Sequence, residues 1–267
     1  MVAYIALYLV TSLPACTYLP LPALFRVFSI SYYMQAAARR RQWQPIASMT
    51  TARRGYGLGA LPHGIYAVGG RSQQGWLASV EKYDLENGQW TVVSNMKTKR
   101  ARMGVVALHD SKLIAVGGYD SPPSLATVEE FDIPTNQWVS LPNMFEKRSG
   151  AGVSILDQMV YVVGGYDGSK PLNTMEMYDV RACRWERSLQ SMPTARSGLK
   201  LAHIGGLLYA IGGNGGGRYL NIVECFDPCA SKWRTVAPLT TERSSPGVAV
   251  LEDMLYVTGG QNIRGSC

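Results

Sequence analysis

The first candidate for chemistry in this chain is a glycine pair at the start of a polar loop. The stretch YVVGGYDGSKPLN, residues 161–173, places Gly164-Gly165 directly after an apolar run. Glycines at such a point can cradle a phosphate when a helix follows, because the N–H groups of the first helical turn then face the anion. Cys225 and Cys229 form the one close cysteine pair and could bind a metal ion together with histidines.

The pattern around these residues supports neither chemistry. No helical periodicity follows this glycine pair or any other, so the sequence offers a phosphate no helix N-terminus. The sequence has three histidines and no Cys-x-x-Cys motif, and we therefore expect no metal ion and no cofactor. An odd number of cysteines fits reduced thiols better than a disulfide framework. The five are Cys16, Cys183, Cys225, Cys229 and Cys267.

The glycine pair is instead one member of a repeat. Glycine pairs and single tryptophans each recur at spacings of 47 or 48 residues. A period of this length indicates an architecture of stacked supersecondary units. Besides Trp43, the expected frame residues are Gly69, Gly70, Gly117, Gly118, Gly164, Gly165, Gly212, Gly213, Gly259 and Gly260, with Trp90, Trp138, Trp185 and Trp233.

Each repeat contains four segments typical of β-strands. The segments are short and rich in β-branched and aromatic residues, as in MVYVVGG and NTMEMYD, and Gly, Asp, Asn, Ser and Pro separate them. No apolar pattern with a 3.6-residue period is long enough for a helix. Four antiparallel strands repeated at this period predict an all-β propeller, whose blades pack side by side around a central channel.

Further positions recur within each unit. A Tyr-Asp or Phe-Asp pair stands six or seven residues before a tryptophan, and a glutamate stands two residues before the aromatic residue; the pairs are Tyr83-Asp84, Phe131-Asp132, Tyr178-Asp179 and Phe226-Asp227. We expect the glycine pairs to permit close backbone approach, and the tryptophans and Tyr/Phe residues to join neighbouring blades. The arginine four residues after a methionine, or after Leu239 in the last unit, is expected to bond the glutamate or a backbone carbonyl. These arginines are Arg53, Arg100, Arg148, Arg196 and Arg243.

These repeats resemble kelch repeats. The combination of glycine pair, Tyr/Phe-Asp, Trp and Met-x-x-x-Arg is most similar to the kelch domain of the BTB-kelch (kelch-like) proteins, and it covers residues 43–267. The resemblance implies a kelch-type β-propeller of four-stranded antiparallel blades. Kelch-like propellers usually close with six blades, so we expect about four complete blades plus a partial fifth, a truncated propeller that could stand open.

Residues 1–42 form an apolar and basic segment outside the repeats. Residues 1–80 hold seven Lys or Arg and no Asp or Glu, whereas residues 81–267 hold nineteen of each. The net charge of +7 is therefore local and predicts no nucleic-acid partner. Three prolines would interrupt a membrane-spanning helix, and no basic residue precedes the apolar run, as a secretory signal requires. Secretory or membrane targeting by residues 1–25 stays open, but we favour a start foreign to an intracellular propeller.

The resemblance also implies a partner-binding face. In kelch-like proteins the loop after the glycine pair and the loop after Met-x-x-x-Arg share one face and hold the partner. Arginine, tyrosine and serine there would suit an acidic or phosphorylated peptide, although an ordinary solvated loop stays open for each residue. The predicted partner-binding residues are Arg54, Arg71, Trp76, Arg102, Tyr119, Ser149, Tyr166, Lys170, Ser197, Arg218, Tyr219 and Ser244.

The function that the resemblance implies is protein interaction, similar to that of the substrate-recognition domain of a cullin-3 ubiquitin-ligase adaptor. Cullin-3 itself would bind only if a longer product supplied a BTB domain. An actin-binding cytoskeletal role stays open, because no motif separates the two. Kelch-fold enzymes such as copper oxidases and sialic-acid mutarotases are disfavoured, since His63, His109 and His203 are expected near strand ends and no catalytic arrangement stands out. We expect a cytoplasmic protein that is not an enzyme, with cytoskeletal association as an alternative.

Overall fold

The computed structural model describes residues 45–251 and 253–266. The chain divides into two units, Met1–Ser48 and Met49–Cys267, and every described strand belongs to the second. The predicted N-terminal segment and its boundary at residue 42 lie outside the described residues, as do Trp43, Cys16 and Cys267.

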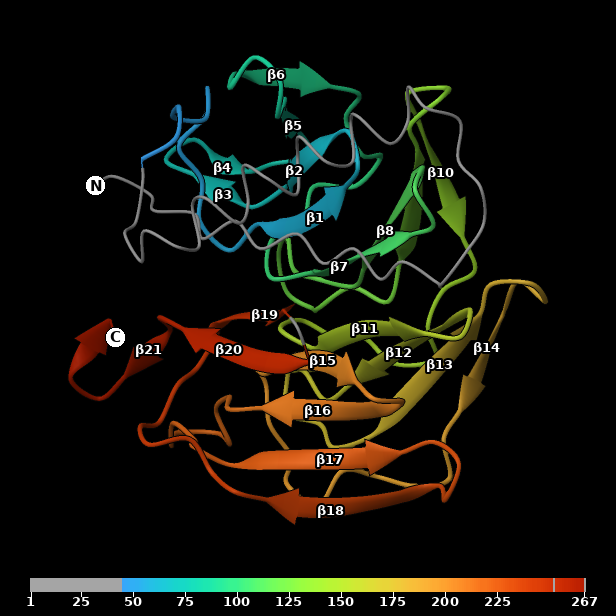
Figure 1. Cartoon of the computed structure of the whole chain (residues 1–267), viewed down its shortest axis with the longest axis vertical. Coiled ribbons are helices and arrows are strands. Elements are labelled where there is room, and N and C mark those ends of the chain that lie inside the picture. Colours follow the sequence, from blue (N-terminus) through green and yellow to red (C-terminus); the bar gives the residue numbers. More distant parts are fainter. Residues whose placement is uncertain (1–44, 252, 267) are drawn as a thin grey trace. The chain divides into compact units, whose positions relative to one another are not determined.

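Short β-strands are the regular elements of the described chain (Figure 1). They are β1 (Gly57–Leu61), β2 (Gly64–Val68), β3 (Arg71–Ser72), β4 (Gly75–Trp76), β5 (Val80–Tyr83), β6 (Trp90–Val93), β7 (Gly104–Leu108), β8 (Lys112–Val116), β9 (Val128–Asp132), β10 (Gln137–Leu141), β11 (Gly152–Leu156), β12 (Met159–Val163), β13 (Met175–Asp179), β14 (Arg184–Arg187), β15 (Lys200–Ile204), β16 (Leu207–Ile211), β17 (Val223–Asp227), β18 (Lys232–Val236), β19 (Gly247–Leu251), β20 (Met254–Thr258), β21 (Gln261–Asn262) and β22 (Gly265–Ser266).

Four sheets of four antiparallel strands follow one another along the chain, and a fifth sheet contains β19 and β20. Strand order within each four-stranded sheet follows the sequence, as in a meander. The first strands of successive sheets contact one another, β1 with β7, β7 with β11, β11 with β15 and β15 with β19. This confirms the predicted all-β propeller of four complete blades and a partial fifth. The short hairpins β3–β4 and β21–β22, which follow a glycine pair, were not predicted.

The second strand is the most buried strand of the first and third blades. In β12 every residue after Met159 is buried, and β2 is buried throughout. Such a strand has a partner on both edges and packs against neighbouring blades on both faces. Its sequence is therefore a nearly continuous apolar run rather than an alternation of apolar and polar residues.

The recurring tryptophans connect each blade to the preceding one. Trp138 lies opposite Phe131 across β9 and β10, with ring centroids 5.1 Å apart, and both rings join the buried cluster that contains Tyr66 of the first blade. The indole Nε1 of Trp138 donates a hydrogen bond of 3.0 Å to the carbonyl of Ser94, which follows the first blade. The indole thus contributes both apolar area and a polar contact to the interface between blades.

The glycine pairs meet a steric requirement of the backbone. Gly117 and Gly118 have φ angles of +60° and +107°. A Cβ on Gly117 would lie 2.4 Å from the carbonyl oxygen of Arg148 in the next blade. The N–H of Gly118 donates to that same oxygen at 2.8 Å. Two glycines are needed because a side chain would both clash there and disfavour the left-handed backbone.

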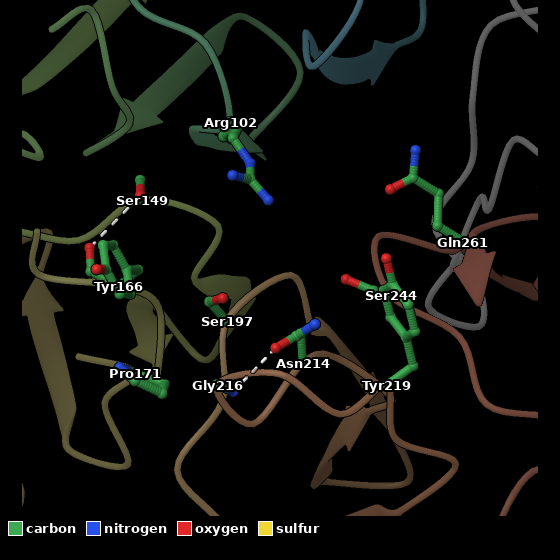
Figure 2. A pocket seen from close by; sticks show the side chains of 10 residues that line it. All are labelled: Arg102, Ser149, Tyr166, Pro171, Ser197, Asn214, Gly216, Tyr219, Ser244 and Gln261. Carbon is green, nitrogen blue, oxygen red and sulfur yellow. Dashed lines mark hydrogen bonds between the residues drawn. The ribbon is translucent and has the colours of Figure 1, made fainter. Parts of the chain in front are cut away.

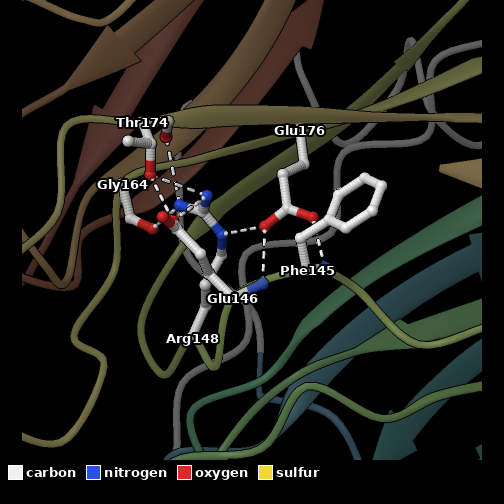
Figure 3. Close-up of polar contacts among 6 residues, drawn as sticks. All are labelled: Phe145, Glu146, Arg148, Gly164, Thr174 and Glu176. Atoms are coloured by element: carbon white, nitrogen blue, oxygen red, sulfur yellow. Dashed lines mark hydrogen bonds and ion pairs between the residues drawn. The ribbon is translucent and has the colours of Figure 1, made fainter. Parts of the chain in front are cut away.

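A buried arginine holds the segments of each blade together, as Figure 3 shows for Arg148. Its Nη1 donates to the carbonyls of Gly164 at 2.7 Å and Thr174 at 3.0 Å, and its Nε lies 3.0 Å from a carboxylate oxygen of Glu176. The Glu176 carboxylate also accepts the backbone N–H of Phe145 at 2.7 Å. One guanidinium therefore connects the glycine pair, the start of the third strand and the loop that enters the blade.

The same contacts recur in the first two blades, where Arg53 lies 2.5 Å from Glu81 and Arg100 lies 2.7 Å from Glu129. Burial by itself would raise the pKa of Glu81, but hydrogen bonds from Thr50 and the Arg53 guanidinium outweigh it and place the pKa below its ordinary value. A lowered pKa means that the folded protein favours the charged carboxylate. The contribution to stability is thus complete above pH 4.5, the ordinary value, and is lost as the pH falls through the lowered pKa.

The fourth blade departs from this arrangement. Ile222 stands where Ser79, Thr127 and Thr174 provide a hydroxyl to the arginine in the other blades. Nη1 of Arg196 still lies 3.0 Å from Glu224, but it makes no hydrogen bond with the described residues, whereas a terminal nitrogen of each counterpart donates to the hydroxyl. The buried guanidinium of the fourth blade is therefore less well satisfied than its counterparts.

The substitution Ile222→Thr should restore the missing acceptor. We expect it to raise the free energy of unfolding by about 1 kcal/mol, since a hydrogen bond to a charged donor outweighs the lost apolar contact. The reverse change in the third blade, Thr174→Ile, should lower it by about 1–3 kcal/mol. Urea unfolding of both variants checks the pair, and a destabilised Ile222→Thr protein would contradict the role given to the hydroxyl.

The tryptophan contacts give a second prediction. Trp185→Ala should lower the free energy of unfolding by about 3–5 kcal/mol, because Trp185 is buried against Tyr178 with ring centroids 5.1 Å apart. Leu189→Ala is the control, since that side chain is 98% exposed and its loss should change stability by less than about 0.5 kcal/mol. Equal melting temperatures for the two variants would refute the packing role of Trp185.

Candidate functional site

A pocket of about 290 Å³ opens where loops of successive blades meet (Figure 2). Its volume is at the lower limit of ligand pockets, which suits one or two amino-acid side chains better than a large cofactor. The lining residues are Arg102, Ser149, Tyr166, Pro171, Ser197, Asn214, Gly216, Tyr219, Ser244 and Gln261.

Paired loop positions build the pocket wall. The residue after the recurring arginine forms an isolated β-bridge with the residue after the glycine pair, as between Ser149 and Tyr166, and between Ser197 and Asn214. Both loops start from the buried arginine and the glycine pair, which fix their backbones. The third, fourth and fifth blades thus each present side chains from two anchored positions to the same pocket.

A line of backbone hydrogen bonds joins the blades at the second residue after each recurring arginine. The N–H of Arg102 donates to Gly55 at 2.6 Å, Gly150 donates to Arg102 at 2.7 Å, Gly198 donates to Gly150 at 2.7 Å and Ser245 donates to Gly198 at 2.6 Å. All five residues have φ between +54° and +63°. Glycine adopts this conformation readily, whereas Arg102 and Ser245 adopt it against the steric preference of a residue with a side chain.

Arg102 is the one charged residue among the described residues that line the pocket. Its side chain is exposed and extends into the pocket in Figure 2. Its guanidinium makes no hydrogen bond or ion pair with the described residues, whereas Arg100, two residues earlier, is buried and bonds Glu129. A strained backbone that presents an unused cation is typical of a functional residue. A planar guanidinium suits a carboxylate or phosphate group.

Three serines add hydroxyl groups to this cation. Ser149 and Ser244 are buried, and the Ser149 hydroxyl accepts a hydrogen bond of 3.1 Å from Ser124. A Cβ on Gly198 would lie 2.5 Å from the Ser244 hydroxyl, so the glycine leaves room for that group. The Ser149 hydroxyl donates to the carbonyl of Tyr166 at 3.4 Å, so the hydroxyls of Ser197 and Ser244 are the ones left beside the arginine. Such hydroxyls can donate to an anion, and no carboxylate is among the described lining residues.

The structure brings half of the predicted partner-binding residues together. Those that line the pocket are Arg102, Ser149, Tyr166, Ser197, Tyr219 and Ser244. Those that do not are Arg54, Arg71, Trp76, Tyr119, Lys170 and Arg218.

The residues outside the pocket have other surroundings. The Arg71 guanidinium lies 4.7 Å from the centroid of the Trp76 ring, and Trp76 lies edge-on to Tyr119 at 6.0 Å. Arg54 is exposed and pairs with Arg71 only through the backbone. Lys170 and Arg218 are exposed, and their carbonyl groups accept hydrogen bonds within their own loops.

Four lining residues were absent from the predicted set. Asn214 and Gln261 directly follow a glycine pair, as Tyr166 does, so the repeat carried a signal for them. Pro171 forms a bridge with Tyr166 across the same loop, and Gly216 donates its N–H to Asn214 at 2.9 Å. No sequence pattern marks Pro171 or Gly216, because the fold of their loops places both residues in the pocket.

Other chemistries find no support in the part of the chain that the structure describes. Within residues 45–251 and 253–266, no three His, Cys, Asp or Glu side chains gather as metal ligands would. The same residues include no helix with the length and apolarity required to span a bilayer.

The strain at Arg102 predicts the effect of its removal. Arg102→Gly should keep or raise the free energy of unfolding, by up to about 1 kcal/mol, because glycine relieves the left-handed backbone. Gly150→Ala makes the opposite change at the equivalent position and should cost about 1–3 kcal/mol. Thermal melts of the two variants check this. A large loss of stability in Arg102→Gly would mean that the arginine holds the fold rather than a ligand.

Comparison with known proteins identifies the repeats. Residues 62–260 match the family described as the KLHDC2/KLHL20/DRC7 Kelch-repeats domain. Kelch-like protein 36 of Rattus norvegicus is 40% identical over 58 residues, which are 22% of this chain and 10% of that protein. The Influenza virus NS1A-binding protein homolog of Xenopus laevis is 40% identical over 65 residues, 24% of this chain and 10% of that protein. The matched segments thus span about a tenth of the length of these curated relatives.

A solved structure supports the fold independently. The structure titled "Structure of YjhT" superposes with a TM-score of 0.71 over 81% of this chain and 75% of its own, at 16% identity. At that identity the likeness concerns the fold alone.

Proposed function

Because this chain belongs to the kelch-repeat family, we propose that it is a protein-interaction module that holds an acidic or phosphorylated segment of a partner protein in the pocket around Arg102. The observation that carries the proposal is the combination of an unused guanidinium and a strained backbone at that residue. In the four complete blades the recurring arginines are buried against glutamates, whereas Arg102 is exposed and bonds none of the described residues.

The surroundings of Arg102 favour an anionic group on the partner. Serine hydroxyls lie along the same pocket and can donate to oxygen atoms of a carboxylate or phosphate. Tyr166 and Tyr219 provide flat surfaces on either side of the opening, and such residues contribute much of the binding energy in protein interfaces. The pocket volume fits a side chain that anchors a longer partner segment along the loop face.

The comparisons support a protein as the partner. One relative carries the name of a homolog of a viral-protein-binding protein. The finer assignment, a substrate-recognition part of a cullin-3 adaptor, belongs to the proposal only for a product that also carries a BTB domain. The proposed role is binding without catalysis, in the cytoplasm. We do not extend the proposal to actin, because no feature of the described residues favours a filament over a peptide.

The proposal is tested with fluorescein-labelled libraries of acidic and phosphoserine peptides against the purified 267-residue chain. Fluorescence anisotropy should identify acidic binders whose affinity falls at least about tenfold in Arg102→Gly, which corresponds to about 1.4 kcal/mol. Affinity should also fall with added salt.

Arg218→Gln is the matched control, because it removes one exposed positive charge outside the pocket. Equal losses in the two variants would show that only net charge matters. An acidic binder that is unaffected by Arg102→Gly would refute the pocket as the site.

A further inference from the structure

The third blade exposes two large apolar side chains near its last strand, β14. Phe145 lies in the loop that enters the blade and is 53% exposed. Leu189 lies two residues after β14 and is 98% exposed. A single exposed apolar residue is ordinary on a protein surface, whereas apolar residues that gather on one surface mark an interaction site.

The loop that contains Phe145 packs against β14. The indole Nε1 of Trp185 donates a hydrogen bond of 2.8 Å to the carbonyl of Pro142, and the guanidinium of Arg187 lies 4.6 Å from the centroid of the Phe145 ring. The N–H of Phe145 donates to the Glu176 carboxylate at 2.7 Å, and Figure 3 shows the ring turned away from the buried arginine. Loop and strand therefore form one surface with a fixed backbone.

An extra residue places Leu189 in a turn beside this surface. Trp185 and Met192 are seven residues apart, whereas the corresponding tryptophan and methionine or leucine of the other blades are six residues apart. The Ser188 hydroxyl accepts the N–H of Gln190 at 3.1 Å and closes the turn. Because Leu189 directly follows the end of β14, it lies at the edge of the surface that Phe145 occupies.

The other blades have different residues at the positions of Phe145 and Arg187. One blade earlier the two positions hold Lys97 and Ser140, whose side chains form a hydrogen bond of 3.4 Å. The corresponding pairs of the first and fourth blades are Thr50 with Val92 and Pro193 with Thr235. The frame thus requires neither an aromatic residue nor an arginine there, and packing within the blade does not explain the pair.

Two cations of this surface have no carboxylate partner. Arg187 covers the Phe145 ring, Lys147 is exposed, and neither makes an ion pair or a hydrogen bond with the described residues. The neighbouring glutamates are already paired with arginines, and the pairs are Glu146 with Arg148, Glu176 with Arg148 and Glu186 with Arg184. A guanidinium stacked on a ring still has its N–H groups free at its edge, so it can donate to a carboxylate.

We propose that Phe145, Lys147, Arg187 and Leu189 form an interaction surface for an acidic protein segment that carries apolar side chains. The apolar side chains would pack on Leu189 and on the open part of the Phe145 ring, and the carboxylates would pair with the two cations. None of the four residues lines the loop pocket, so the proposal does not depend on the proposed function.

Charge and geometry favour this occupant over two others. A second copy of the chain would meet this surface with the same surface in a symmetric dimer, and the unpaired cations would then repel one another. An anionic membrane requires apolar side chains that are free to enter it, whereas the Phe145 ring is stacked under Arg187. An acidic segment of another protein supplies both the apolar contact and the missing carboxylates.

The test is a subtractive selection of random peptides displayed on phage. The phage are first depleted on a variant of the 267-residue chain that carries Phe145→Thr and Leu189→Ser, and then selected on the wild type. Threonine is the residue that the frame already accepts at the first of these positions, as Thr50. We expect the enriched peptides to combine Asp or Glu with Leu, Ile or Phe, because those side chains complement the surface.

Fluorescein-labelled copies of the enriched peptides then test the charge, which the selection does not impose. By fluorescence anisotropy they should bind the wild type saturably, and Arg187→Gln should weaken binding about tenfold. Affinity should also fall with added salt. Leu189→Ser alone should weaken binding by a similar factor, and it keeps the test valid if the double variant fails to fold, since that side chain is 98% exposed.

Two controls separate this surface from the rest of the chain. Val92→Ser is the matched control, because Val92 is 62% exposed and holds the position of Arg187 in the first blade. Arg102→Gly removes the cation of the loop pocket. Both proteins should bind the enriched peptides as the wild type does.

Several results would overturn the proposal. They are a selection that enriches no peptide, enriched peptides without acidic residues, and equal affinity for the Arg187→Gln and Val92→Ser proteins. A dimer of the chain that Leu189→Ser dissociates would assign the surface to a second copy. Binding to phosphatidylserine vesicles that Leu189→Ser abolishes would assign it to a membrane.

Discussion

The bond between a buried guanidinium and the carbonyl of a glycine pair is the interaction on which the rest of this structure depends. In the third blade one arginine contacts the glycine pair, the residue before the third strand and the glutamate within it. That glutamate in turn accepts backbone N–H groups of the entering loop. Removing one member of such a buried pair typically costs about 3–5 kcal/mol, because the other charge is left without a partner.

The same bond positions the candidate site. The residue after the buried arginine and the residue after the glycine pair form a bridge at the rim, so their side chains are fixed by the core and not by the loops. Two arginines two residues apart therefore have different roles. Arg100 is buried within the frame, whereas Arg102 lies on the line of backbone bonds that joins the blades and presents its guanidinium to the pocket.

The repeat made most of the fold predictable from the sequence. Glycine pairs, tryptophans and alternating short strands are local signals that recur, so they identify the blades and their order. Which loop residues converge depends on contacts across blades, and no local pattern carries that information. Trp76, predicted to bind a partner, packs against Arg71 and Tyr119 outside the pocket, and its role in binding stays a prediction.

The left-handed backbone of Arg102 was not predicted from the sequence either. It becomes visible only when Arg102 is aligned with Gly55, Gly150 and Gly198, which hold the same position in other blades. Ile222 shows a third limit of prediction from the sequence. The sequence shows that Ile replaces the Ser or Thr of the other blades, but only the structure shows which hydrogen bond of Arg196 is lost as a result.

Amide hydrogen exchange tests the dependence on the buried arginines most directly. The N–H groups of Lys97 and Phe145 bond the carboxylates of Glu129 and Glu176, and that of Gly165 bonds the carbonyl of Arg196. Although Lys97 and Phe145 lie in exposed loops, their amides should exchange nearly as slowly as those of the central strands. Exchange at the rate of the exposed loop around Leu189 would contradict the central role of the arginine and glutamate pairs.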